Sequence, residues 1–157
     1  MILSCRLSLT SIPVCPTAQQ RRCRYLSARS RINQIEAAIV RRIFEEFAKG
    51  RSPRAIAGAL NKEAISSPAG KTWGPSTIYG NWRRGTGILN NELYIGRLVW
   101  NRQQFIKDPH TGRRQARLNL EAKWIVENVP HLRIVDDQLW NLVKERQRAS
   151  RSRSVSE

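Results

Sequence analysis

The strongest constraint on the fold is a pair of helical patterns that meet at a very short connection, residues 50–53. Apolar residues recur at helical spacing from Ile35 to Phe47, and charged residues occupy the opposite side. Gly50 follows, and glycine readily adopts the positive φ that ends a helix. Ser52-Pro53 then supplies an N-cap and a first helical residue. The sequence therefore predicts two helices joined by a tight turn.

A third helix is predicted to begin at Gly74-Pro75-Ser76-Thr77, because the fixed φ of proline suits the first helical position. Ile78 and Trp82 lie four residues apart, which predicts that both face the same side of this helix. Its other side would carry polar residues able to reach phosphates or base edges. We expect a short recognition helix in a helix-turn-helix-like unit. The alternative, that the aromatics form core and the arginines a solvated face, stays open.

Strand patterns dominate the rest of the chain. Residues 93–100 and 124–126 carry strand-forming side chains, and 105–107 continue in extended form. Residues 108–112, Asp-Pro-His-Thr-Gly, are a strong turn signal between two arms of a hairpin. Asp136 and Asp137 precede a last helical pattern, as capping residues do. The fold class is therefore α+β and helix-rich: a helix-turn-helix-like three-helix unit, then a small β-sheet and hairpin, then a C-terminal helix.

The net charge indicates a polyanionic partner. The chain carries a formal charge of +16 and has a pI near 11.3, which is typical of nucleic-acid-binding proteins. An anionic membrane is disfavoured because the sequence has no apolar run of about 18 residues. Residues 71–117 hold nine basic and two acidic side chains. We therefore expect the nucleic acid to contact this segment.

Two groups of residues are candidates for DNA binding. The basic hairpin would act as a wing on backbone phosphates, although an ordinary solvated hairpin is the alternative. The candidates for the groove and its adjacent phosphates are Lys71, Thr77, Asn81, Arg83 and Arg84, and those for the DNA backbone are Arg97, Arg102, Arg113, Arg114 and Arg117.

No catalytic, metal-binding or cofactor-binding set is predicted. Cys5, Cys15 and Cys23 form no Cys-x-x-Cys pair, and His110 and His131 are too distant in sequence to suggest a zinc site. Residues 1–33 show no periodicity and are expected to be a disordered or non-native leader. Residues 34–148 would form the domain, and residues 149–157 a disordered basic tail.

Four separated blocks resemble the recombinase domain of large serine recombinases, which are the phage integrases, transposases and resolvase-like enzymes. The blocks are IVRRIFEEFAKGRSPRAIAGALNKEAI, PAGKTW followed by STIY, GILNNELYIGRLVWNR, and LRIVDDQLW. The resemblance covers about residues 34–148. The matching positions are Gly50, Ile56, Ala57, Leu60, Asn61, Trp73, Ser76, Thr77, Ile78, Leu89, Asn90, Tyr94, Gly96, Asn101, Leu132, Ile134, Val135, Asp136 and Trp140.

The resemblance implies a DNA-binding domain that contributes attachment-site binding to DNA recombination or integration by a mobile element. Its partners would be double-stranded DNA and, through association, a second copy or a full-length recombinase. It implies a cytoplasmic, nucleoid-associated protein of a bacterium or phage. A stand-alone DNA-binding regulator and a basic RNA-binding protein are the alternatives.

The family's catalytic Tyr-x-Arg-x-Ser strand is not matched. Residues 25–30, Tyr-Leu-Ser-Ala-Arg-Ser, place serine where arginine should be and arginine where serine should be. The nucleophilic serine of that family attacks a DNA phosphodiester while arginines neutralise the phosphate. We therefore expect a truncated piece of a recombinase that does not cleave DNA by itself.

Overall fold

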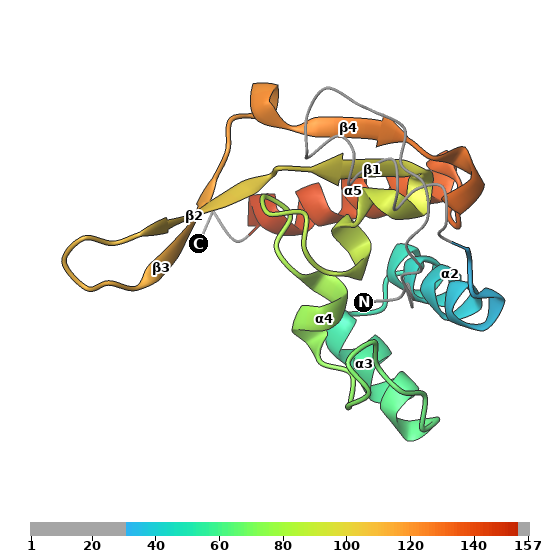
Figure 1. Cartoon of the computed structure of the whole chain (residues 1–157). Coiled ribbons are helices and arrows are strands. Elements are labelled where there is room, and N and C mark those ends of the chain that lie inside the picture. Colours follow the sequence, from blue (N-terminus) through green and yellow to red (C-terminus); the bar gives the residue numbers. More distant parts are fainter. Residues whose placement is uncertain (1–30, 154–157) are drawn as a thin grey trace, which may run out of the picture.

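The computed structural model describes residues 31–153 and has the expected α+β class (Figure 1). Short 3₁₀ turns connect several of its elements. The helices are α2 (Gln34–Ala48), α3 (Pro53–Lys62), α4 (Pro75–Tyr79) and α5 (Asp137–Arg153), and the strands are β1 (Arg97–Trp100), β2 (Gln103–Lys107), β3 (Arg114–Leu118) and β4 (Ile125–Asn128).

The tight connection between α2 and α3 is confirmed. Gly50 has a φ of +106°, and the Ser52 hydroxyl accepts a hydrogen bond from the Ala55 N–H at 3.2 Å. Ala55 lies in the first turn of α3, so this bond satisfies one of the donors that a helix N-terminus leaves unpaired. Ile35, expected on the apolar side of α2, is instead 76% exposed because it lies in the first turn, before the helix meets the core.

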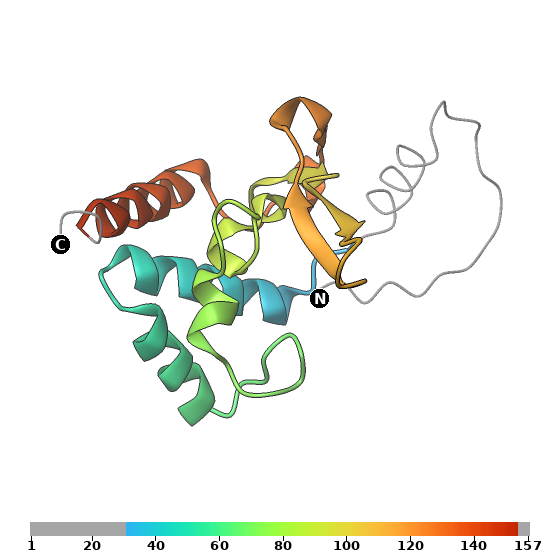
Figure 2. The ribbon, with the colours of Figure 1, turned by 90° about the vertical axis from the view of Figure 1, so that its left-hand side faces the viewer.

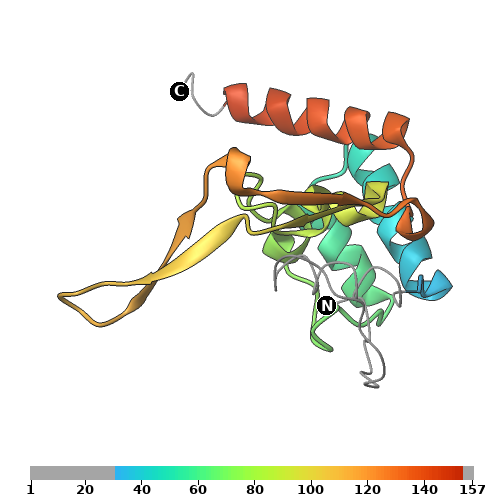
Figure 3. The same ribbon diagram turned by 45° about the horizontal axis from the view of Figure 1, so that its top comes forward.

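The core lies where α2 meets α5 and the connection before β1 (Figures 2 and 3). The Phe44 ring stacks on the Trp140 ring, with 5.8 Å between the ring centres, and meets the Tyr94 ring edge-on, with 6.2 Å between the ring centres. Such aromatic pairs stabilise a core beyond the area they bury. The buried cluster comprises Val40, Ile43, Phe44, Phe47, Ile56, Ala57, Leu60, Trp73, Ile78, Ile88, Leu89, Tyr94, Val135, Trp140 and Val143.

The predicted recognition helix is shorter than expected. α4 ends at Tyr79, and Trp82 is 51% exposed, so Ile78 and Trp82 do not share a buried helical face. The cause is Gly80, whose φ of +56° turns the chain away from the helix axis. The prediction of a helix continuing to Trp82 is therefore wrong.

The strand predicted over residues 93–100 begins later, at Arg97. The Asn91 side chain accepts the Leu93 N–H at 3.1 Å and starts a 3₁₀ turn over Glu92–Ile95, which Gly96 ends in the left-handed conformation. β1 then pairs antiparallel with β4, and β2 with β3, as two separate two-stranded sheets. The predicted turn at residues 108–112 connects β2 and β3, so the hairpin prediction is confirmed.

α5 continues to Arg153, so the first residues of the predicted disordered tail are helical. Arg146 shows why the chain stays ordered here. Its guanidinium donates to the carbonyls of Phe47, Gly50 (2.6 Å) and Arg51 (2.9 Å) and lies 4.3 Å from the centre of the Phe47 ring. Arg146 thus joins α5 to the end of α2 and to the connection that follows it.

Candidate nucleic-acid interface

The β2–β3 hairpin extends away from the helical body (Figures 1 and 3). Its register runs from Gln103 opposite Leu118 to Lys107 opposite Arg114. Phe105 is 64% exposed, and Ile106 and Leu118 are also exposed. An isolated two-stranded hairpin is at best marginally stable in water. Both faces of this hairpin are therefore largely exposed, and it does not contribute to the core.

The hairpin turn is organised by Asp108. Its carboxylate accepts hydrogen bonds from the N–H of His110 (3.0 Å), the hydroxyl of Thr111 (2.8 Å) and the amide of Gln115 (3.1 Å). The bonds from the His110 backbone and the Thr111 hydroxyl lower the pKa of Asp108. The acidic side chain is thus engaged within the turn. The exposed cations of the hairpin are Lys107, Arg113, Arg114 and Arg117.

The base of the hairpin is held by two asparagines. The Asn119 side chain donates to the Asn101 carbonyl at 2.8 Å, and the Asn119 N–H donates to the Arg102 carbonyl at 2.9 Å. Arg102 pairs with Glu92, and its guanidinium lies 4.9 Å from the centre of the Trp124 ring. Only 15% of the Arg102 side chain is exposed. This predicted DNA-backbone residue therefore belongs to the scaffold in this structure.

A second basic element is the loop formed by residues 81–86, which we call the Trp82 loop. The Asn81 N–H donates a hydrogen bond to the Thr86 carbonyl, and the Thr86 N–H donates one to the Asn81 carbonyl, each at 3.1 Å. The Asn81 side-chain oxygen accepts the N–H groups of Arg83 (3.0 Å) and Arg84 (3.2 Å). Asn81, predicted to reach the groove, therefore shapes the loop. Trp82, Arg83 and Arg84 are exposed on it.

Two glycines close the base of the Trp82 loop. A Cβ on Gly80 would overlap the Thr86 carbonyl, and a Cβ on Gly87 would lie 2.6 Å from the Gly80 Cα. Both have positive φ, which L side chains rarely adopt. Glycine is therefore required at both positions for the two ends of the loop to touch.

Asn90 and Lys144 connect the Trp82 loop to α5. The buried Asn90 amide donates to the carbonyls of Tyr79 (2.7 Å) and Thr86 (2.9 Å), on either side of the loop. Lys144 donates to the Asn90 side-chain oxygen at 2.9 Å and lies 4.4 Å from the centre of the Trp140 ring. Burial lowers the pKa of Lys144 to about 8. A buried polar network thus fixes the loop to α5.

The remaining predicted contact residues are Lys71, Thr77 and Arg97. Lys71 is exposed in the α3–α4 connection, where its N–H donates to the Ser67 hydroxyl at 3.2 Å. Arg97 is half exposed and lies 3.4 Å from Glu92. Thr77 is half-buried on α4 and lines a cavity. Thr77 therefore lies near the Trp82 loop, whose Gly85 and Thr86 line the same cavity, and Arg97 lies near the base of the hairpin, because Arg102 pairs with the same Glu92.

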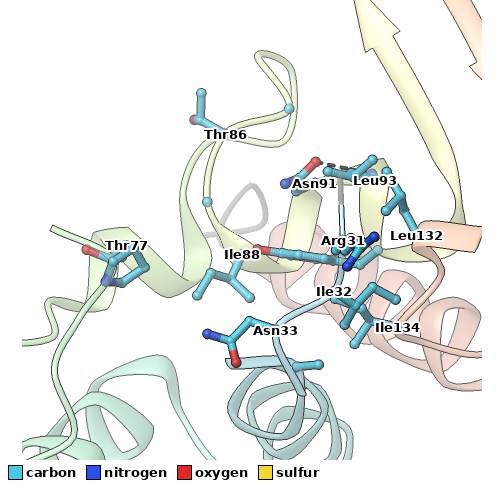
Figure 4. Close-up of a pocket in the computed structure, with 15 residues that line it drawn as sticks. Arg31, Ile32, Asn33, Thr77, Thr86, Ile88, Asn91, Leu93, Leu132 and Ile134 are labelled. Atoms are coloured by element: carbon cyan, nitrogen blue, oxygen red, sulfur yellow. Dashed lines mark hydrogen bonds between the residues drawn. The ribbon is translucent and has the colours of Figure 1, made fainter. Parts of the chain in front are cut away.

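That cavity has a volume of about 530 Å³ and lies between the start of α2 and the segment after the Trp82 loop (Figure 4). Ile88, Leu93, Leu132 and Ile134 give it a largely aliphatic lining. Among the described residues that line it, none is Asp, Glu, His or Cys.

Within residues 31–153, no three His, Cys, Asp or Glu side chains are grouped so that they could hold a metal ion. Cys5, Cys15 and Cys23, and the serine and arginine of residues 25–30, lie outside the described residues. None of the described helices is long and apolar enough to span a bilayer.

A family model described as Recombinase matches residues 34–150. The chain belongs to the Recombinase family. The match confirms the resemblance to the recombinase domain of serine recombinases and associates the chain with site-specific recombination. No curated protein and no solved structure matches the chain.

Three features of this Recombinase domain were not predicted: the exposure of Trp82, the position of Arg151 on its ring, and the Asn90–Lys144 network. The Arg151 guanidinium lies 4.3 Å from the centre of the Trp82 ring. The glycines that flank the Trp82 loop were an available signal, since Gly80 and Gly87 both disfavour a continuing helix. The contacts from α5 had no local signal, because they join residues more than fifty positions apart.

Proposed function

We propose that this Recombinase domain binds double-stranded DNA at an attachment-type site and contributes site binding, not strand cleavage, to recombination. The observation that carries the proposal is the projecting hairpin, in which exposed cations accompany exposed apolar side chains. Phe105 and Ile106 are exposed beside Lys107, and Arg113, Arg114 and Arg117 occupy the return arm. A partner that covers this hairpin must be anionic and must offer apolar surface as well.

Duplex DNA meets both requirements. Its phosphates attract arginine and lysine, and its major groove admits a two-stranded β-ribbon and presents thymine methyl groups to apolar side chains. The pairing of Arg102, at the base of the hairpin, with Glu92 of the body holds the hairpin relative to the body. The Trp82 loop, which carries Arg83 and Arg84, provides a second basic contact.

Salt-dependent binding to a labelled duplex tests this proposal. Each phosphate contact contributes about 0.9 to the slope of log affinity against log salt concentration. The triple variant Arg113→Ala/Arg114→Ala/Arg117→Ala should reduce that slope by about 3 and leave the thermal transition unchanged, because these side chains are exposed. Fluorescence anisotropy in a KCl series measures the slope.

The matched control removes three exposed cations from the region of α3 and its connection to α2, in Lys49→Ala/Arg54→Ala/Lys62→Ala. It makes the same change in net charge, so it measures the general effect of charge. Equal loss of slope in the two variants would contradict a binding surface on the hairpin. Equal or tighter binding to an RNA duplex of the same sequence would favour the RNA-binding alternative.

A further inference from the structure

Trp82 combines exposure with rigidity. It is 51% exposed, although its loop is closed by the Asn81–Thr86 pair and fixed below by Asn90. A single exposed apolar residue is common on protein surfaces. Trp82 differs from such a residue because its loop has little conformational freedom. Little further conformational entropy is therefore lost when Trp82 contacts a partner.

Two guanidinium groups from different elements accompany the indole. Arg83, in the same loop, lies 5.3 Å from the centre of the Trp82 ring, and Arg151, from α5, lies 4.3 Å from it. Both guanidinium groups lie over the ring, a position that cation–π attraction favours. Trp82 is still 51% exposed, so part of its flat apolar surface stays open to solvent beside two positive charges.

We propose that Trp82 is a wedge that stacks on a partly unstacked base step of duplex DNA, with Arg83 and Arg151 binding the phosphates beside that step. Apolar side chains that insert between base pairs kink the duplex in this way, and pyrimidine–purine steps such as TA open most easily. The proposal rests on the proposed function and names the part of the DNA that the Trp82 loop contacts.

The test uses duplexes of about 30 base pairs, roughly three helical turns, that carry a TA step in each turn and a donor and an acceptor dye at their two ends. A wedge that kinks the duplex brings its ends closer together. Wild-type protein should therefore raise the energy transfer between the dyes on binding, and Trp82→Ala should not. Trp82→Ala should also weaken binding about tenfold without changing the salt slope, because the indole carries no charge. Trp82→Phe, which keeps an aromatic ring, should retain most of the affinity and of the change in energy transfer.

Arg83→Ala is the matched control, since it removes a charge from the same loop and should lower the salt slope by about 1. If Trp82→Ala instead lowers the salt slope as Arg83→Ala does, then Trp82 only supports the arginines, and the wedge proposal is wrong. The wedge proposal is also wrong if duplex binding is intact but the wild-type protein leaves the energy transfer between the end dyes unchanged. Absence of duplex binding by the wild-type protein would overturn the proposed function and the wedge together.

Discussion

The helical body and the β2–β3 hairpin use the same residue types in opposite ways. Phe44 on α2 is fully buried, whereas Phe105 on β2 is 64% exposed. The body buries its apolar side chains in one cluster, while Ile106 and Leu118 on the hairpin face solvent. The body therefore supplies the stability of the fold, and the hairpin keeps its side chains available to a partner.

The arginines differ in the same way. Arg146 is engaged by the backbone carbonyls at the end of α2, and Arg102 by Glu92 and the Trp124 ring. Arg113 and Arg114 are exposed on the hairpin. The number of arginines in the chain therefore overstates how many guanidinium groups can contact a partner, because some of them hold the fold together. Burial and hydrogen bonding distinguish the two kinds of arginine.

Truncating the two phenylalanines should give the largest contrast. Phe44→Ala leaves a cavity beside Trp140 and Tyr94, and we expect it to lower the free energy of unfolding by about 3–5 kcal/mol. Phe105→Ala removes an exposed ring and should change that free energy by less than about 0.5 kcal/mol. Urea denaturation measures both values. Similar losses in the two variants would show that the hairpin packs against the body.

Lys144→Met tests the network that joins α5 to the Trp82 loop. Lys144 donates to the Leu89 carbonyl (2.8 Å) and to the side-chain oxygens of Asn90 (2.9 Å) and Gln147 (3.2 Å). The variant leaves these acceptors without that donor, so the free energy of unfolding should fall by about 1–3 kcal/mol. The free energy should be measured by urea denaturation at neutral pH. An unchanged value would mean that the loop is held without Lys144.

The same variant should alter the pH dependence of stability. Burial lowers the pKa of Lys144 in the folded protein to about 8; Glu92 opposes the shift, and Arg151, Arg102 and Arg148 add to it. The unfolded chain keeps the ordinary lysine pKa of about 10.4 and binds more protons between these values. Lys144 should therefore make the wild-type protein more stable as pH rises from about 8 to 10. Lys144→Met should lack this contribution, and parallel pH profiles for the two proteins would contradict it.

The sequence predicted the parts of the fold whose signals are local. Gly50 and Ser52-Pro53 lie within the turn that they specify, and residues 108–112 lie within the hairpin that they close. The C-terminal helix was predicted from its own apolar spacing, and Trp140 and Val143 are buried as expected.

The length of α4 and the roles of single arginines could not be predicted in this way. Trp82 fits a helical pattern with Ile78. It lies outside the helix because the chain turns back on itself where Gly80 and Gly87 come into close contact. Arg146 lies near the end of the predicted domain and carries no local signal of a structural role, yet it binds carbonyls about a hundred positions away. Such contacts depend on the assembled fold, and no local pattern reports them.

The smallest expected effect concerns Asp108, at the far end of the hairpin. Its hydrogen bonds favour the carboxylate and lower its pKa, so its contribution to the turn is complete above its unfolded value, near 3.9, and is lost as pH falls through the lowered folded value. The chemical shift of the His110 amide, which donates to this carboxylate, should titrate with a midpoint below 3.9. Asp108→Asn should abolish that titration and leave amide signals of α2 and α5 unchanged. A midpoint at or above the ordinary value, or shifts that spread into the helices, would mean that the turn and the body are coupled and that the hairpin is not the independent region described above.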